Sequence, residues 1–66
     1  MKITVNQKLL VLDDKMSLER LLVNLAVTTK YMAVEVNEII IPKSEYTKYQ
    51  LKNGDVVEVI NAVGGG

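Results

Sequence analysis

Only one stretch of this chain has the apolar spacing of a helix, and the segments on both sides of it are patterned as strands. Between Leu18 and Val27, apolar side chains recur at intervals of three and four residues, which places them on one face of a helix. Ser17 precedes the stretch as a favourable N-cap. The apolar face comprises Leu18, Leu21, Leu22, Leu25 and Ala26. Such a helix gains most of its stability by burying this face, so the rest of the chain has to supply the surface that covers it.

We expect a strand in each of five further segments, because their residues alternate between apolar and polar or form short apolar runs. These segments are 1–6, 8–12, 31–37, 39–41 and 55–60. Turns are expected between them at Asn6–Gln7, Asn37–Glu38 and Asn53–Gly54. The alternation predicts inward-facing side chains at Met1, Ile3, Val5, Val34, Val36, Val57 and Val59.

The order of these elements predicts an α+β domain in which one main helix covers one face of a mixed sheet of four or five strands. We expect the first and last strands to lie side by side in the middle of that sheet. Pro42 ends the short strand before it, and a single helical turn capped by Ser44 follows. Leu51 is expected to close the underside of the core.

The chain has 66 residues, which is enough for one small domain. We expect residues 1–60 to form the folded domain and residues 61–66, NAVGGG, to form a flexible glycine-rich tail. No apolar run approaches the ~20 residues that cross a bilayer, and there is no charged and then apolar leader. The expected location is therefore the cytoplasm, with no membrane partner.

The balance of charged residues and the absence of the usual catalytic residues exclude several functions. Eight basic and eight acidic residues cancel, and the scattered lysines form no basic patch for nucleic acid. Histidine and cysteine are absent, so the commonest general base, thiolate nucleophile and metal ligands are missing. Ser17 and Ser44 are better explained as helix caps, and Asp13–Asp14 as a solvated loop. We therefore expect no catalytic residues, no metal site, no bound cofactor and no enzymatic activity in this chain.

The remaining reactive group is the α-carboxylate of Gly66, which is ionised at neutral pH. It can attack the α-phosphate of ATP to give an acyl-adenylate, from which a sulfur donor releases AMP and leaves a thiocarboxylate. Gly64, Gly65 and Gly66 lack Cβ atoms, so they can thread a channel only as wide as the backbone. The alternative is a frayed terminus or a cloning remnant without function.

Two segments carry a resemblance to a known family. VEVNEIIIPKSEY (residues 34–46) and LKNGDVVEVINAVGGG (residues 51–66) closely resemble the sulfur carrier proteins of thiamine biosynthesis, the ThiS family. That family commonly shows V-N-G-E-x-V-P-R-S-E-[WY], then L-x-D-G-D-x-V-E-I and a terminal A-V-G-G-G or A-G-G. The resemblance spans the whole chain. Gln7 and Glu38 stand where glycine is usual in the turns, and Asn53 replaces the usual aspartate.

The resemblance implies a ubiquitin-like β-grasp fold and a sequence of partners. An E1-like adenylyltransferase, using ATP and Mg²⁺, would adenylate Gly66. Sulfur from a cysteine desulfurase would then form the thiocarboxylate, which would donate it to thiazole synthase for thiazole formation. In the family the terminal glycine pair, here Gly65–Gly66, enters the active sites of these partners.

The partners also need a surface to hold. The side chains predicted to face inward leave four apolar residues for the outer face of the sheet: Leu9, Val11, Val56 and Ile60. Val63 lies at the start of the tail. Contiguous exposed apolar side chains usually mark an interface, although scattered ones are common on any surface. We expect a partner interface at Val11, Val56, Ile60 and Val63.

Other functions remain open at this point. A sulfur carrier for molybdopterin synthesis or for transfer-RNA thiolation has the same kind of tail. A ubiquitin-like modifier would instead form isopeptide bonds with lysines of its targets. A regulatory β-grasp module would use its body alone, with an incidental tail.

Overall fold

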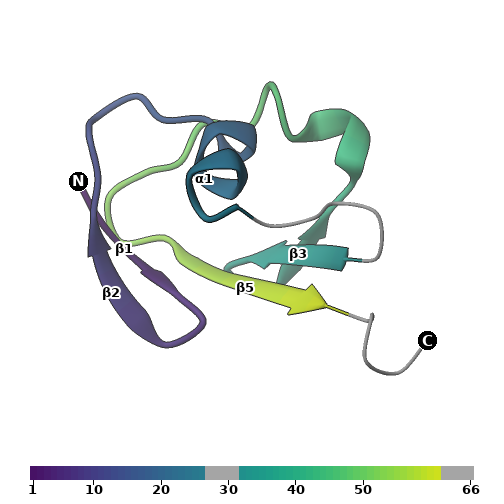
Figure 1. Ribbon diagram of the computed structural model, residues 1–66, viewed down its shortest axis with the longest axis horizontal. Helices are drawn as coiled ribbons and strands as arrows, with labels where there is room; N and C mark the ends of the chain where they lie inside the picture. Colours follow the sequence, from purple (N-terminus) through teal and green to yellow (C-terminus); the bar gives the residue numbers. More distant parts are fainter. Residues whose placement is uncertain (27–31, 62–66) are drawn as a thin grey trace.

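The structure is a computed structural model and describes residues 1–26 and 32–61 (Figure 1). Its five strands form one sheet in the order β2-β1-β5-β3-β4. The elements are β1 Lys2–Val5, β2 Lys8–Val11, α1 Leu18–Asn24, β3 Met32–Val36, β4 Ile39–Ile41, the 3-10 turn η2 Lys43–Glu45 and β5 Val56–Asn61. A mixed sheet of this order, with one helix packed across it, is a β-grasp fold, as the sequence and its resemblance predicted.

The first and last strands, β1 and β5, are neighbours in the interior of the sheet. β1 and β5 run parallel, with Thr4 beside Val56 and Val5 beside Val57. β5 is antiparallel to β3 on its other side, and the two β-hairpins β1–β2 and β3–β4 complete the sheet. The prediction that the first and last strands are neighbours is therefore confirmed. β5 is held between two strands, so it leaves the sheet from an interior position.

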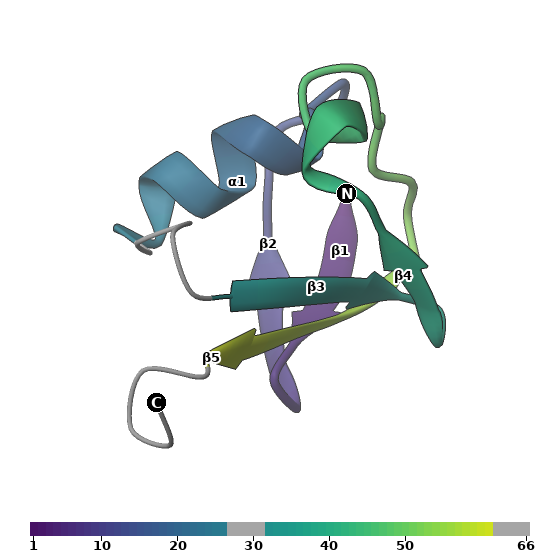
Figure 2. The ribbon, with the colours of Figure 1, turned by 90° about the vertical axis from the view of Figure 1, so that its right-hand side faces the viewer.

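The core lies between the sheet and α1, which crosses one face of it (Figure 2). The helix contributes its three apolar side chains of the first two turns, and the sheet contributes the inward positions of β1, β3 and β5. The most buried of these side chains are Ile3, Leu18, Leu21, Leu22, Val34, Val36 and Val57. Ile41, Tyr46 and Leu51 close the end of the core, as predicted for Leu51. Met1 and Val59, both predicted to face inward, are only half-buried against this core.

The helix begins where the sequence predicted it and ends earlier. The N–H of Arg20 donates to Ser17 Oγ at 3.1 Å, which confirms Ser17 as the N-cap. The helix ends at Asn24 with Leu25 as its C-cap, so the prediction of a helix to Val27 was too long. Ala26 has a φ of +56°, a left-handed conformation that stops helical hydrogen bonding. Leu25 and Ala26 consequently lie beyond the last turn and are exposed.

The prediction of Ser44 as a cap was wrong. The single turn η2 spans Lys43–Glu45 and its N-cap is Pro42, with no side-chain capping bond. The proline ring fixes φ at −64°, and the Pro42 carbonyl accepts from the N–H of Glu45 at 2.9 Å. The N-cap therefore lies two residues earlier than predicted, and Ser44 lies inside the turn.

Both hairpin turns use left-handed residues. Asn6 and Gln7 have φ values of +47° and +71°, and Asn37 and Glu38 have φ values of +52° and +70°. Two consecutive positive φ angles define the type I′ turn that suits the twist of a two-residue hairpin. Asparagine tolerates this conformation, whereas glutamine and glutamate are strained in it. Gln7 and Glu38 are the positions where the sequence pattern would have glycine, and the turns form there regardless.

A buried carboxylate fixes the start of β5. Asp55 is buried, and its Oδ1 accepts from Asn37 Nδ2 at 3.0 Å while its Oδ2 accepts from the N–H of Lys52 at 2.8 Å. Asn37 Oδ1 in turn accepts from the N–H of Val56 at 2.9 Å. These bonds tie the β3–β4 turn to the first residue of β5. They set the position from which the last strand runs toward the tail.

Candidate functional site

The predicted reactive end lies beyond the part of the chain that the structure describes. Gly64, Gly65, Gly66 and the neighbouring Val63 fall among residues 62–66, outside the described residues. β5 ends at Asn61, one residue into the segment 61–66 that the sequence assigned to the tail. The division into a domain and a tail, and the roles of these residues, therefore stay predictions.

The strand that leads to this segment is firmly anchored. β5 pairs with β1 on one side and with β3 on the other, where the pairing extends from Val36–Val57 to Met32–Asn61. Asn6 Oδ1 accepts from the N–H of Val59 at 2.8 Å, which adds a side-chain bond beyond the β1 ladder. The β1 ladder covers Val56 and Val57, and the β3 ladder continues to Asn61. Ladder hydrogen bonds restrict local opening, so the sheet holds β5 along its whole length.

The predicted docking residues that are described lie together on the outer face of the sheet. Val56 and Ile60 of β5 are 45% and 48% exposed, and Val11 of β2 is 72% exposed. Leu9 is also exposed and pairs with Thr4, which itself pairs with Val56, so these three residues form one row across the sheet. The helix and η2 cover the opposite face (Figure 2). The sequence thus placed these apolar side chains correctly.

Three further residues of this face were not singled out from the sequence. Ile40 of the edge strand β4 is 64% exposed and pairs with Glu35 of β3, which pairs with Glu58 of β5. No sequence feature singled out Glu35, and Ile40 was predicted only as part of the strand segment 39–41. The signal was present in the two-residue turn at Asn37–Glu38, because that turn fixes which residues of β3 and β4 lie opposite each other.

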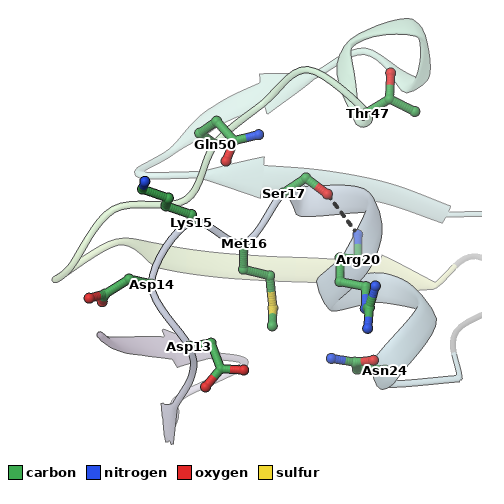
Figure 3. A pocket seen from close by; sticks show the side chains of 9 residues that line it. All are labelled: Asp13, Asp14, Lys15, Met16, Ser17, Arg20, Asn24, Thr47 and Gln50. Carbon is green, nitrogen blue, oxygen red and sulfur yellow. Dashed lines mark hydrogen bonds between the residues drawn. The ribbon is translucent and has the colours of Figure 1, made fainter.

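A polar groove of about 480 Å³ lies beside the N-terminal end of α1 (Figure 3). Its walls include Asp13, Asp14, Ser17, Arg20 and Gln50. The potentially reactive side chains of the groove already make structural contacts. Ser17 Oγ caps the helix, and Asp14 pairs with the N-terminal ammonium of Met1 at 3.2 Å. The groove therefore lacks a nucleophile with an adjacent base.

Within residues 1–26 and 32–61, no three histidine, cysteine, aspartate or glutamate side chains are grouped so that they could hold a metal ion. Over the same residues, no helix is long and apolar enough to span a membrane.

The fold and the outer face define a class of protein: a small β-grasp module in which one helix covers one side of the sheet and apolar side chains lie exposed on the other. The model of the ThiS family matches residues 1–66, and the chain belongs to that family. Members of the family are non-catalytic sulfur carriers of thiamine biosynthesis. This chain is accordingly a carrier, not an enzyme, and its pathway is the formation of the thiazole of thiamine.

Two solved structures are similar to the whole chain. The crystal structure of the thiamine biosynthesis protein ThiS from Geobacter metallireducens is 32% identical, with a TM-score of 0.84 and coverage of 100% of each chain. The solution structure of a thiamine biosynthesis protein from the same organism is 32% identical, with a TM-score of 0.80 and coverage of 100% of this chain and 88% of that one.

One curated relative is much longer. A thiazole synthase from Paramagnetospirillum magneticum is 36% identical over 66 residues. The alignment covers 100% of this chain and 20% of the relative, so the chain spans about a fifth of that protein's length.

Proposed function

We propose that Gly66 is the residue that receives ATP and then sulfur, and that the folded body serves to present it. The observation that carries this proposal is the family match over residues 1–66, which includes the three consecutive glycines. The similarity to the Geobacter metallireducens protein over the full length of both chains supports it.

The proposed chemistry proceeds in two substitutions. First, a carboxylate oxygen of Gly66 attacks the α-phosphorus of ATP, and Mg²⁺-bound pyrophosphate leaves. A sulfur nucleophile from a cysteine desulfurase persulfide then attacks the acyl carbon and AMP leaves; a thiol reduces the resulting acyl disulfide to the thiocarboxylate. The E1-like adenylyltransferase supplies ATP, Mg²⁺ and acid–base groups, because this chain has neither histidine nor cysteine. Because ATP is required, we place the carrier in the cytoplasm.

The proposed recipient of the sulfur is thiazole synthase. The relative from Paramagnetospirillum magneticum supports this partner, because a protein named thiazole synthase contains a segment similar to this whole chain. Joining two proteins in one chain raises their effective concentration for each other, which is useful only when they work together.

The geometry of β5, which pairs with β3 as far as Asn61, supports a division of labour between body and tail. We propose residues 1–60 as the docking body and 61–66 as the segment that threads into partners through Gly64, Gly65 and Gly66. Six extended residues reach ~20 Å, which is enough to enter a buried active site from a body docked outside it. The proposed docking residues are Val11, Val56 and Ile60 on the outer sheet face, together with Val63, three residues after Ile60 in the sequence.

Intact-mass analysis of the protein purified from its native cell tests the proposal. The expected result is a fraction of molecules whose mass corresponds to exchange of one terminal oxygen for sulfur. A variant that lacks Gly66 is the control and should show no such fraction. A ladder of larger conjugates would identify a modifier instead, and a protein that supports thiamine synthesis without ever gaining sulfur would refute the proposal.

A further inference from the structure

Two glutamates occupy directly opposite positions on the outer face of the sheet. Glu35 of β3 and Glu58 of β5 are register partners in the antiparallel pair, so their side chains leave the sheet on the same side. Both are half-buried, whereas Glu38 and Glu45 are exposed. The sequence separates them widely, and only the β3–β5 register brings them together.

The surroundings of this pair are mostly apolar. Ile40 follows Glu35 in the same cross-strand row. Val56 and Ile60 flank Glu58 along β5, and Ala33 lies opposite Ile60. Neither glutamate forms an ion pair with any residue that the structure describes. The ion pair in this part of the chain joins Met1 and Asp14.

The nearest lysines of the sheet lie elsewhere. Lys2 shares the outer face but pairs with Val11 at the far side of β1. Lys8 pairs with the inward-facing Val5, which places it on the helix side of the sheet. The pair of like charges is therefore uncompensated within the described residues, an arrangement that disfavours the folded state.

We propose that the Glu35–Glu58 pair receives an arginine side chain from the adenylating enzyme, an inference that rests on the proposed function. A planar guanidinium has enough donors to bind both carboxylates at once. The apolar side chains around the pair exclude water when a partner covers them, which strengthens that attraction. Docking thus removes the repulsion between Glu35 and Glu58 that is present in the free carrier.

The chemistry of adenylation selects this partner. An enzyme that brings an anionic carboxylate to an anionic triphosphate carries positive charge around the entrance to its active site. Glu58 lies on β5, the strand that precedes the tail in the sequence, so the acidic pair belongs to the part of the body that would dock at the entrance to that site. Complementary charge there increases the rate of encounter and fixes the orientation of the carrier.

The test uses the Glu35→Gln/Glu58→Gln double variant and, as a control of equal charge, the Glu38→Gln/Glu45→Gln double variant. Affinity for the adenylating enzyme is measured by calorimetry over a series of salt concentrations, together with thermal unfolding of each free carrier. We expect the face variant to bind about tenfold more weakly or worse, with a smaller salt dependence. Its melting temperature should rise, because the repulsion is gone. The control should bind like the wild type.

A second measurement separates the two proposals. ATP–pyrophosphate exchange driven by the face variant should show a raised KM for the carrier with an unchanged kcat, because the tail is intact. If the wild type drives no exchange, the proposed function fails; if both proteins drive it with equal KM, this inference alone fails. A loss of affinity confined to thiazole synthase, or wild-type self-association that the face variant abolishes, would also overturn it.

Discussion

The side chain of Asn37 joins the β3–β4 turn to Asp55 at the start of β5. Asn37 Nδ2 donates to Asp55 Oδ1 at 3.0 Å, and the N–H of Asn37 donates to the Val56 carbonyl at 2.7 Å. Asp55 is buried, and each of its oxygens has a donor. The motif N-G-D at residues 53–55, which read from the sequence as turn chemistry alone, thus also supplies the central polar contact of the fold.

The first prediction concerns this contact. Asp55→Ala leaves the Asn37 amide and the Lys52 N–H without their partner at a partly buried place, so we expect a loss of about 1–2 kcal/mol in the free energy of unfolding. Urea denaturation followed by circular dichroism measures it. Asp13→Ala, at an exposed loop position, should leave the midpoint unchanged. Equal midpoints for the two variants would mean that Asp55 contributes nothing to stability.

The second prediction concerns the strained turns. Glu38→Gly relieves a side chain at φ +70°, and Gln7→Gly relieves one at φ +71°. Because glycine adopts this conformation without strain, each change should stabilise the fold by about 0.5–1 kcal/mol. The same urea titration checks both variants.

The control for the turns is the neighbouring residue. Asn37 also has a positive φ, but its side chain bonds to Asp55 and to the N–H of Val56. Asn37→Gly removes these bonds, so it should destabilise the protein. If glycine lowered stability equally at 37 and 38, backbone strain would not be what distinguishes these positions.

Most of the architecture could be predicted because it depends on local patterns. The alternation of apolar and polar residues identified the strands and the side chains that face inward. A shift of one residue in the strand pairing would expose the whole apolar face, so this assignment is strongly determined. Ser17 was recognisable as a cap from its position before the apolar stripe. The outer-face residues Val11, Val56 and Ile60 followed by subtraction from the inward sets.

The features that were missed depend on tertiary contacts. The left-handed Ala26 ends α1 although alanine favours helices, and no local pattern signals it. Pro42 starts η2 in place of Ser44 because the chain leaves β4 at that residue. The Glu35–Glu58 pair requires the register between two strands that are distant in sequence. Such a register is set by the fold as a whole.

The third prediction concerns alkaline pH. Burial raises the pKa of Tyr46, and burial together with the negative charge of Asp55 raises the pKa of Tyr49, both above the ordinary value of 10.0. A pKa raised in the folded state means that folding favours the neutral phenol. This contribution is fully present below pH ~10, where unfolded tyrosine titrates, and is lost as the pH rises through the folded values.

Thermal unfolding between pH 8 and 12 tests this prediction. The melting temperature of the wild type should fall above pH ~10. The Tyr46→Phe/Tyr49→Phe variant cannot ionise at these positions, so its fall should be shallower. Parallel curves for the two proteins would assign the alkaline loss to other groups.

The fourth prediction concerns the docking face. Ile60→Asp places a charge that a bound partner would have to desolvate, so affinity for the adenylating enzyme should fall about tenfold or more. Ile60 is half-exposed in the free protein, and the fold should persist. Val23→Asp, at an exposed position of α1 on the opposite side of the sheet, is the matched control and should bind normally. Calorimetry with the purified enzyme distinguishes them, and equal affinities for both variants would move the interface away from β5.

The fifth prediction separates the tail from the body. Deleting Gly66 removes the proposed reacting carboxylate and leaves the next one a residue short of its place, so adenylation should fall by at least about a hundredfold. Among the residues that the structure describes, every fully buried apolar side chain of the core lies between Ile3 and Val57, so the melting temperature should stay at the wild-type value. ATP–pyrophosphate exchange and differential scanning calorimetry on the same preparation measure the two effects. A variant that unfolds would show that residue 66 contributes to the body, and one that still exchanges pyrophosphate would show that the carboxylate need not lie at Gly66.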